Sequence, residues 1–266
     1  MKPIFLSSPH SGEMIPEEVI WLSHLPETIL MCDVDRYVDR LYAPGCERLA
    51  IPFIVTPWHR YVVDLNREPQ DIDGQCVAGA VGAVGKEFVS ALHWVRTTKG
   101  DLLMPQPMAP SLHERLVDKY WRPFHEQVLA QFAHFRRMGH DQIYHLDVHS
   151  MPSQGTGKHL DAGQRRPQIV VSDYHGKSCA PKFRDLVVHA YESAGFEVKV
   201  NWPYQGGRIT QLYGRPELGQ HTVQVEMNRA LYMDEITKQE RDSSFGEVQS
   251  KLELVLVDIE KNLPLI

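Results

Sequence analysis

The chain contains few cysteines, and this scarcity excludes a fold built on disulfides. Its four cysteines, Cys32, Cys46, Cys76 and Cys179, are spread over 266 residues without a Cys-x-x-Cys spacing. That distribution does not resemble a secreted disulfide framework. We expect reduced thiols that pack among other side chains. Cys76 lies in a glycine-rich stretch, but no neighbouring base marks it as a nucleophile.

Long apolar runs and an excess of basic residues are also missing. No apolar run approaches the roughly 18 residues of a membrane-spanning helix, and the first residues lead into a strand-like segment rather than a signal peptide. We therefore expect a cytoplasmic protein without membrane contact. The formal net charge of −6 and the pI near 6.1 argue against a broad phosphate-binding surface, so nucleic acid is not an expected partner.

What is present is an ordinary globular composition, with 42% hydrophobic and 23% charged residues. A chain of 266 residues is long enough for one large α/β domain. Strand-like and helix-like segments alternate along the chain, which is the pattern of a layered α/β fold. No internal repeat or linker divides the sequence, so we predict a single domain over residues 1–266.

Hydrophobic periodicity predicts where the elements lie. Residues 68–110 are rich in Gly and Pro and are predicted as a long loop with a short helix at 86–92, and residues 201–214 as a polar loop. Ser111 and Glu114 form a Ser-x-x-Glu pattern that predicts a capping box. Strands are predicted at 4–8, 52–57, 61–65, 142–148, 168–172, 197–201 and 221–227, and helices at 33–50, 111–138, 181–194 and 245–262.

Two short motifs at predicted strand ends supply the ligands of a metal site. His10 and Glu13 follow the apolar run at residues 4–9, and an Asp-Val-His-Ser motif that contains His149 follows residues 142–146. A His-x-x-Glu pair and a distant His provide two imidazoles and a carboxylate, which leaves a zinc ion one open position for water. The pattern therefore predicts the ligand set of a zinc hydrolase.

Strand alternation adds a second group to this site, because residues two apart share a face. His145, Asp147 and His149 should therefore line up together. Asp147 is placed to orient His149 or another ligand, as carboxylates commonly do for metal-bound imidazoles. A His at a strand end before a Gly-rich loop favours a ligand role for His149, whereas His145 is interpreted as a core or surface residue.

Glu226 closes a predicted strand among apolar neighbours, where an unpaired carboxylate is costly to bury. Near a zinc-bound water, Glu226 would be the general base that takes the proton and returns it to the leaving amine. The alternative is a salt bridge to Arg229 or to another Arg.

Arg60, Asn66 and Arg67 lie around another predicted strand end. A guanidinium binds a carboxylate through two parallel hydrogen bonds, so an Arg here suits an acidic substrate. A structural ion pair with Asp64 is the competing interpretation.

Six motifs together resemble the N-formylglutamate amidohydrolase family over nearly the whole chain. Each motif alone is weak, but their joint occurrence and order are specific. The family is in turn similar to zinc carboxypeptidases and aspartoacylases. The motifs are Pro9-His10-Ser11-Gly12, Asp33-Val34-Asp35 with Val38-Asp39-Arg40-Leu41-Tyr42, Arg60-Tyr61-Val62-Val63-Asp64-Leu65-Asn66-Arg67, Asp147-Val148-His149-Ser150, Gln205-Gly206-Gly207-Arg208-Ile209-Thr210 and Gln224-Val225-Glu226-Met227-Asn228-Arg229.

The resemblance implies a three-layer α/β fold with a mixed central sheet, of the zinc-carboxypeptidase-like (phosphorylase/hydrolase-like) type. It implies one catalytic domain with one zinc ion per chain, and a small acidic N-acyl amino acid as substrate. For N-formyl-L-glutamate, water would release formate and L-glutamate, as a step of histidine degradation.

The resemblance also implies roles for individual residues. Glu226 would shuttle the proton, and Arg67 is the first choice for stabilising the oxyanion or binding a carboxylate. Arg60 and Arg208 are candidates for the two glutamate carboxylates. The candidate substrate-binding residues are Arg60, Asn66, Gly207, Arg208 and His175, of which His175 can equally be interpreted as a loop histidine.

One departure from the family concerns the acidic metal ligand. Family members usually lack a Glu at the position of Glu13, and their acidic ligand is better matched by the second Asp of the Asp-x-Asp motif, here Asp35. Both carboxylates remain candidates beside His10 and His149. Asp33 and Asp35 can also be interpreted as acidic residues in a first helical turn, where the helix dipole favours them.

Two alternative functions stay open. A zinc amidohydrolase or peptidase acting on another N-acyl amino acid or a small peptide would keep the metal and Glu226 but change the pocket. A non-catalytic ligand-binding protein on the same fold is the second alternative.

Overall fold

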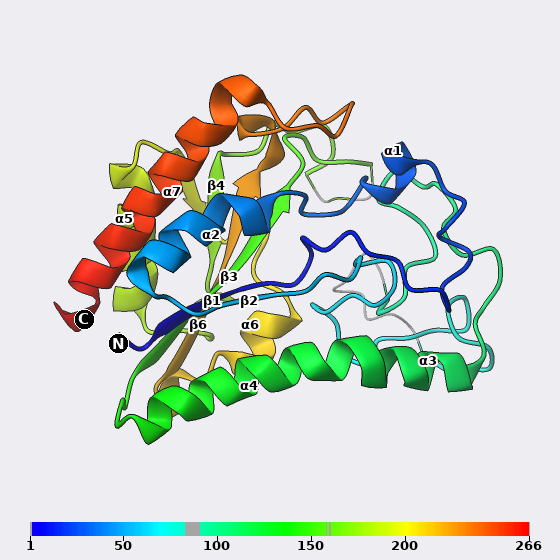
Figure 1. Ribbon diagram of the computed structural model, residues 1–266, viewed down its shortest axis with the longest axis horizontal. Coiled ribbons are helices and arrows are strands. Elements are labelled where there is room, and N and C mark those ends of the chain that lie inside the picture. Colours follow the sequence, from blue (N-terminus) through cyan, green and yellow to red (C-terminus); the bar gives the residue numbers. More distant parts are fainter. Residues whose placement is uncertain (1, 83–90, 158, 160, 266) are drawn as a thin grey trace.

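The computed structural model describes residues 2–82, 91–157, 159 and 161–265. Within them, a six-stranded sheet of order β2-β1-β3-β6-β4-β5 lies at the centre (Figure 1). Strands β1, β2, β3 and β6 are parallel, whereas β4 runs antiparallel to β6 and parallel to β5, so the sheet is mixed as predicted. The strands are β1 (Ile4–Ser8), β2 (Phe53–Val55), β3 (Ile143–Met151), β4 (Ile169–Ser172), β5 (Val198–Val200) and β6 (Gln220–Asn228).

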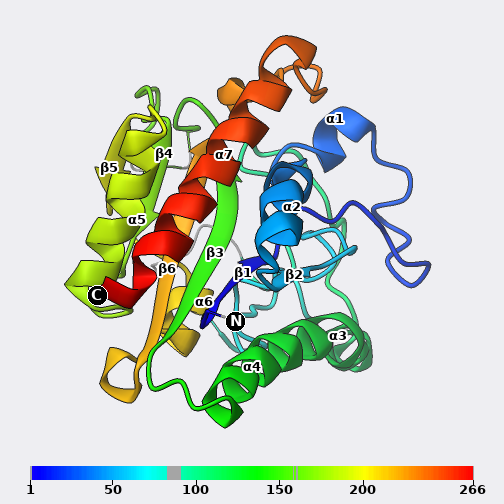
Figure 2. The same ribbon diagram turned by 60° about the vertical axis from the view of Figure 1, so that its left-hand side comes forward.

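Helices cover both faces of this sheet (Figures 1 and 2), which confirms the predicted three-layer α/β fold. One face carries α2 (Val38–Leu49), α5 (Pro181–Ser193) and α7 (Asp242–Asn262), and the other carries α4 (Arg122–Arg137) and α6 (Arg208–Tyr213). The remaining helical segments are α1 (Glu27–Leu30), α3 (Pro110–Leu116), the π-helical turns of Val117–Trp121, and 3-10 turns at Pro216–Leu218, Arg229–Leu231 and Leu263–Leu265.

Strand alternation gives the two faces of the sheet different chemistry. On β3, Leu146 and Val148 join the hydrophobic cluster under α2, α5 and α7. His145, Asp147 and His149 point to the opposite face, where hydrogen bonds connect them, as the sequence predicted. The face under α2, α5 and α7 is therefore mainly an apolar core, and the polar side chains of His145, Asp147 and His149 lie on the other.

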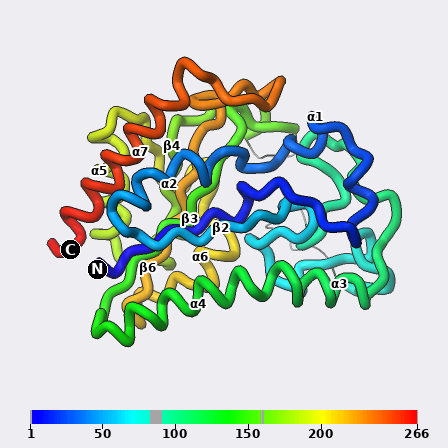
Figure 3. The backbone as a smooth tube through the Cα atoms, in the orientation of Figure 1, coloured from blue at the N-terminus to red at the C-terminus, as the bar shows by residue number. Residues whose placement is uncertain are grey.

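The polar face of the sheet is covered differently at the beginning and at the carboxyl ends of its strands. Phe132 and Phe135 of α4 pack on Phe5 of β1, with ring centroids 4.9 and 6.5 Å apart, and cover the beginning of the sheet. The described residues between β2 and α3, 56–82 and 91–109, gather beyond the carboxyl ends of β1 and β2 (Figure 3). Polar side chains at those carboxyl ends are therefore enclosed by loops rather than by a helix.

Several local predictions are wrong. Residues 61–65 form turns rather than a strand, with Val62 N donating to His59 O at 2.9 Å and Asp64 N donating to Leu92 O at 2.8 Å. Their apolar side chains are buried against the following loop, which gives a strand-like pattern without strand pairing. The predicted polar loop at 201–214 contains α6.

Helix starts also differ from the prediction. Helix α2 begins at Val38 instead of residue 33, because Tyr37 has a left-handed backbone with φ of 71°. The predicted capping box is absent, since α3 begins at Pro110 with no side-chain cap, and proline is well suited to a first helical position. Most of the predicted helix at 86–92 lies outside the described residues. The other predicted strands and helices are confirmed, with small shifts of their ends.

The four cysteines are free and buried, Cys76 included, as expected for thiols that serve packing. Among the helices of the described residues, none combines the length and the apolar character needed to cross a membrane.

Gly12 marks a close contact between the loops that follow β1 and β2. A Cβ added at Gly12 would lie 2.5 Å from the backbone carbon of Pro57 and 2.5 Å from the carbonyl oxygen of Thr56. We predict that Gly12→Ala lowers the free energy of unfolding by about 1–3 kcal/mol, as overpacking does in a dense interior. Urea unfolding followed by circular dichroism measures this change.

Gly246→Ala is the matched control, because an added Cβ in this part of α7 meets nothing within 4 Å. Alanine in place of a helical glycine should raise the free energy of unfolding by about 0.5–1 kcal/mol. Wild-type stability in Gly12→Ala would show that the two loops are not tightly apposed.

Candidate metal centre and active site

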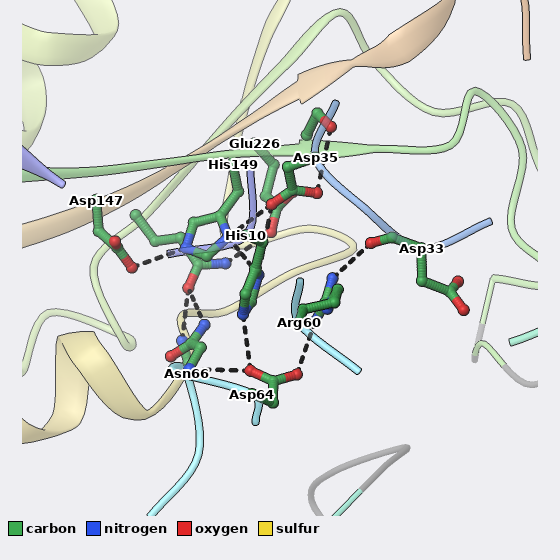
Figure 4. A network of polar contacts seen from close by, with 12 residues as sticks. His10, Asp33, Asp35, Arg60, Asp64, Asn66, Asp147, His149 and Glu226 are labelled. Carbon is green, nitrogen blue, oxygen red and sulfur yellow. Dashed lines mark hydrogen bonds and ion pairs between the residues drawn. The ribbon is translucent and has the colours of Figure 1, made fainter. Parts of the chain in front are cut away.

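Three buried side chains from distant parts of the sequence meet at the carboxyl end of the sheet. His10 follows β1, Asp35 precedes α2, and His149 lies near the end of β3 (Figure 4). One ligand atom from each lies within 4.8 Å of the other two. The backbone ties two of the segments together, since Asp35 N donates to His10 O at 2.9 Å.

The far nitrogen of each imidazole is bound to a carboxylate. His10 Nε2 lies 2.7 Å from Asp64 Oδ1, and His149 Nε2 lies 2.8 Å from Asp147 Oδ2. Because carboxylates only accept hydrogen bonds, both Nε2 atoms carry protons, and in the neutral rings each Nδ1 keeps a lone pair. Such outer carboxylates are the usual support of metal-bound imidazoles, as the sequence predicted for Asp147.

The two Nδ1 lone pairs converge on one carboxylate oxygen. His149 Nδ1 lies 3.0 Å from Asp35 Oδ2 and 3.2 Å from His10 Nδ1, and His10 Nδ1 lies 3.4 Å from Asp35 Oδ2. Three electron-rich atoms repel one another at these distances unless a cation lies among them. Ligand atoms about 2.1 Å from a tetrahedral zinc ion lie about 3.4 Å apart, so this group fits such an ion.

The pKa shifts of Asp35 and His149 also indicate that this group of side chains favours a positive charge. Burial opposes the charge of both groups, yet hydrogen bonds and positive charge from the histidines, when a proton takes the place of a metal at Nδ1, hold the pKa of Asp35 well below its usual range. Asp147 and Asp35 outweigh burial at His149 and hold its pKa well above the ordinary value. The centre therefore attracts a cation.

The second oxygen of Asp35 is hydrogen-bonded to side chains other than the histidines. Asp35 Oδ1 accepts hydrogen bonds from Arg229 Nη2 at 3.0 Å and from Ser150 Oγ at 3.2 Å. Arg229 also donates to the carbonyls of Cys32 and Asp33, at 2.9 and 3.2 Å. This leaves Asp35 Oδ2 directed at the histidines.

Asp64 is the corresponding support on the other side. Its Oδ1 accepts from the backbone N of Asn66 at 2.9 Å as well as from His10, and its Oδ2 accepts from Arg60 Nη2 and Trp94 Nε1, both at 2.9 Å. The ion pair of Arg60 with Asp64, considered from the sequence, is therefore present. It does not remove Arg60 from the cavity, which this residue still lines.

Glu226 lies opposite His149 in the register of β3 and β6. Its Oε1 accepts a hydrogen bond from Gln224 Nε2 at 2.8 Å. Burial raises the pKa of Glu226 to about 7, against the attraction of His149 and with repulsion from Asp35. Among the described side chains no ion pair joins Glu226 to Arg229, so the predicted alternative of a salt bridge between them is not observed. A carboxyl with this pKa can take up and return a proton near neutral pH.

A cavity of about 800 Å³ opens over this group. His10, Asp35, His149 and Glu226 lie in its wall. Of the predicted substrate-binding and catalytic residues, the same wall contains Arg60, Asn66, Arg67, Gly207 and His175. The structure therefore assembles most of the predicted site residues around one space.

Two predicted residues are placed elsewhere. Arg208 is not among the residues that line the cavity, and it binds Asp71 through two hydrogen bonds of 3.0 and 2.8 Å, so the structure does not place it as the predicted carboxylate ligand. Glu13 is 37% exposed and its Oε1 accepts from Arg36 Nε at 2.8 Å. The loop after β1 is extended there, so the His-x-x-Glu spacing does not bring Glu13 back beside His10.

Asp33 and Asp35 do not lie in a first helical turn, because α2 starts later. Asp33 accepts from Tyr61 Oη at 2.6 Å and from Thr98 N at 3.0 Å, outside the group of histidines. Asp35 is thus the acidic candidate that the structure brings to His10 and His149.

Gly207 is required by the close packing of the cavity wall. Its N donates to Gln224 Oε1 at 2.8 Å, and Asn66 Oδ1 accepts from Ile209 N at 2.9 Å. A Cβ at Gly207 would lie 2.2 Å from Asn66 Nδ2, so a side chain here would displace the Asn66 amide.

Sequence reasoning missed part of the cavity wall. Arg166 is fully buried and pairs with Asp161 through hydrogen bonds of 2.7 and 2.9 Å, while its Nη1 donates to Tyr204 Oη at 2.9 Å. Lys177 also lines the cavity. A signal for Asp64 was present, since it stands in the same short run as Asn66. No sequence signal identified Arg166, Asp161, Tyr204 or Lys177, because their spacing along the chain does not indicate that they line the same cavity.

A buried group of two histidines and one carboxylate, at the carboxyl ends of parallel strands in an α/β sheet, is typical of metal-dependent hydrolases. The model of the N-formylglutamate amidohydrolase family matches residues 2–233. The chain belongs to the N-formylglutamate amidohydrolase family, which confirms the resemblance seen in its motifs.

Individual relatives agree with this placement. An N-formylglutamate deformylase from Pseudomonas aeruginosa is 30% identical over 237 residues, covering 88% of this chain and 83% of the relative. One from Pseudomonas putida is 28% identical over 237 residues, covering 88% and 82%. The crystal structure of an N-formylglutamate amidohydrolase from Ralstonia eutropha JMP134 has a TM-score of 0.86 and 26% identity, covering 98% of this chain and 94% of that one.

Substitution of Asp35 and of Glu13 tests which of the two carboxylates is the acidic metal ligand. Asp35→Asn should remove most of the bound zinc, because a neutral amide is a poor ligand and leaves two imidazoles alone. Glu13→Gln should retain it, since Glu13 pairs with Arg36. Elemental analysis of the purified variants, with circular dichroism to confirm folding, measures the difference. Zinc that is lost from Glu13→Gln and kept by Asp35→Asn would reverse the assignment.

Proposed function

We propose that this protein is a zinc-dependent amidohydrolase that hydrolyses N-formyl-L-glutamate to formate and L-glutamate, with residues 1–266 as one catalytic domain. The observation that carries the proposal is the convergence of His10, Asp35 and His149 beside Glu226, in a cavity that Arg67 also lines. The names of the relatives from Pseudomonas support the substrate. A place in histidine degradation and in the cytoplasm stays a prediction.

His10 Nδ1, Asp35 Oδ2 and His149 Nδ1 would hold one zinc ion per chain. A zinc ion in such a site polarises a carbonyl and lowers the pKa of water. Asp64 and Asp147 keep the two imidazoles in the tautomer that presents Nδ1. Arg229 holds the remaining oxygen of Asp35, so the ligand atoms are fixed before a substrate arrives.

Glu226 is the proposed general base and acid. Its carboxylate is available at neutral pH because its pKa lies near 7, so it can accept the proton of the attacking water. The same carboxyl then donates that proton to the amine of the leaving glutamate. Gln224 orients Glu226 through the hydrogen bond to Oε1.

Arg67 is the proposed electrostatic residue. It lines the cavity beside Asn66, and its Nη1 donates to Asn66 O at 2.6 Å. Burial lowers the pKa of Arg67, and the negative charge of Asp64 opposes this effect. A guanidinium remains protonated under these conditions, so Arg67 supplies positive charge to the oxyanion or to a substrate carboxylate. Arg60, Asn66 and His175 complete the proposed substrate contacts.

A second candidate is hydrolysis of a larger N-acyl amino acid or a small peptide. A cavity of about 800 Å³ favours it, because pockets of this size accommodate ligands larger than N-formylglutamate. The metal group and Glu226 would have the same roles in that reaction, and only the contacts around the acyl group would differ.

Glu226→Gln tests proton transfer separately from metal binding. The amide preserves size and still accepts a hydrogen bond from Gln224, but it cannot take a proton. We expect kcat for N-formylglutamate to fall by about 10²- to 10⁴-fold, while zinc content stays at the wild-type level. Steady-state kinetics and elemental analysis on the same preparation give both values.

Glu13→Gln serves as the control for this experiment, because its carboxylate lies outside the cavity and should be dispensable. Loss of zinc from Glu226→Gln would make Glu226 a ligand instead of a base. Near-normal kcat would exclude both roles.

The charge of the cavity predicts the order of substrates. N-formylglutamine lacks one carboxylate and should leave a cation of the site unpaired, at a cost of about 2–5 kcal/mol. An acetyl group adds one methyl to the formyl group, for which pockets discriminate by about 1–3 kcal/mol. We expect kcat/KM to fall from N-formylglutamate to N-acetylglutamate and then to N-formylglutamine.

Equal kcat/KM for N-formylglutamate and N-formylglutamine would refute recognition of a dicarboxylate. Preference for a neutral peptide would favour the second candidate.

A further inference from the structure

A strained turn follows β4 and reaches the cavity. Tyr174, His175 and Gly176 all have left-handed backbones, with φ of 50°, 55° and 79°. Residues with a Cβ avoid this conformation, and two in succession persist only where the surroundings impose it. Tyr174, His175 and the next residue but one, Lys177, line the cavity.

Asp173 imposes this conformation. It is fully buried, and its Oδ1 accepts from Gly176 N at 2.9 Å and from Asn201 Nδ2 at 2.7 Å. Its Oδ2 accepts from Arg184 Nη1 at 3.1 Å. The turn is therefore fixed to the end of β5 and to α5, and Lys177 has a defined backbone position.

A second hydrogen bond joins the turn to another segment that lines the cavity. Tyr174 N donates to Gln205 O at 2.9 Å, and Gln205 belongs to the loop that leads to Gly207. The Lys177 Nζ lies 5.2 Å from the centre of the Tyr174 ring, within the range of a cation–π contact. Both the backbone and the ammonium of this segment are thus positioned at the cavity.

Lys177 differs from other cations of the cavity in its partners. Among the side chains that the structure describes, no ion pair involves the Lys177 ammonium. In contrast, protein carboxylates already bind three cavity guanidinium groups. These pairs are Arg60 with Asp64, Arg166 with Asp161, and Arg229 with Asp35.

We propose that Lys177 is a specificity-determining residue that binds the distal carboxylate of an acidic N-acyl amino acid, with Tyr174 positioning its ammonium. This inference rests on the proposed function and adds a residue to it. Lys177 takes the place that the sequence suggested for Arg208, whose guanidinium is occupied by Asp71.

The register of the sheet separates Lys177 from the reacting centre. Strand β4 is antiparallel to β6, with Val170 opposite Glu226 and Ser172 opposite Gln224. The chain therefore leaves β4 about 7 Å along the sheet from Glu226, which is two residues of a strand. Beyond the turn, Ser178 O accepts from Thr222 N at 2.9 Å, so the segment that carries Lys177 lies farther still along β6 from Glu226. Of the groups of a bound substrate, the distal carboxylate therefore lies nearer to Lys177 than the reacting amide does.

The test is a comparison of two substrates in the full-length, zinc-containing enzyme. Lys177→Gln should lower kcat/KM for N-formylglutamate by about 10- to 100-fold, the range for a hydrogen bond to a charged group, and mainly through KM. The value for N-formylglutamine, which has no distal charge, should change by less than about 2-fold. Lys177→Arg keeps the charge and should recover most of the loss.

Lys182→Gln is the matched control, because Lys182 is exposed on α5 outside the cavity wall, and its removal should change neither substrate. A similar loss for both substrates in Lys177→Gln, or no loss for either, would overturn the role of Lys177 while leaving the proposed function intact. A wild-type enzyme without deformylase activity would overturn the proposed function, and this assignment with it.

Discussion

The site depends on two carboxylates that lie behind the histidines and do not line the cavity. Asp64 and Asp147 each bind the Nε2 proton of one imidazole, and so decide which nitrogen of His10 and His149 keeps its lone pair. Without them both rings would be free to change tautomer or rotate. The energetic cost of burying these charges is offset by hydrogen bonds, of which Asp64 accepts four and Asp147 accepts two.

The sheet makes this arrangement possible through alternation alone. Its apolar face carries the main core under α2, α5 and α7, which leaves the other face free to hold polar side chains. Parallel β1, β3 and β6 end at the same edge, so His10, His149 and Glu226 meet there although they are far apart in sequence. The face opposite α2, α5 and α7 thus carries the site near the carboxyl ends of the strands and a second apolar cluster with Phe5 and Phe132 near their beginning.

Much of this was predictable, and the failures have physical causes. Strand endings and residue types identified His10, His149 and Glu226, because periodicity is a local property of the chain. The choice between Glu13 and Asp35 was not local, since it depends on where an extended loop travels after β1. Arg208 was misplaced for the same reason: its partner Asp71 lies in a long loop whose course no sequence pattern indicates.

Coordination of a metal through Nδ1 would restrict which ions the site can accept. Nδ1 is bonded to the ring carbon next to Cβ, so its position follows the backbone closely, with a shorter lever than Nε2 would have. With Nε2 also anchored, neither ring can swing to follow an ion of a different radius. A larger cation would have to move the segment of His10 away from Asp35 and from the end of β3, and the hydrogen bond from Asp35 N to His10 O resists this movement. The backbone would therefore limit the ionic radius that the site accepts.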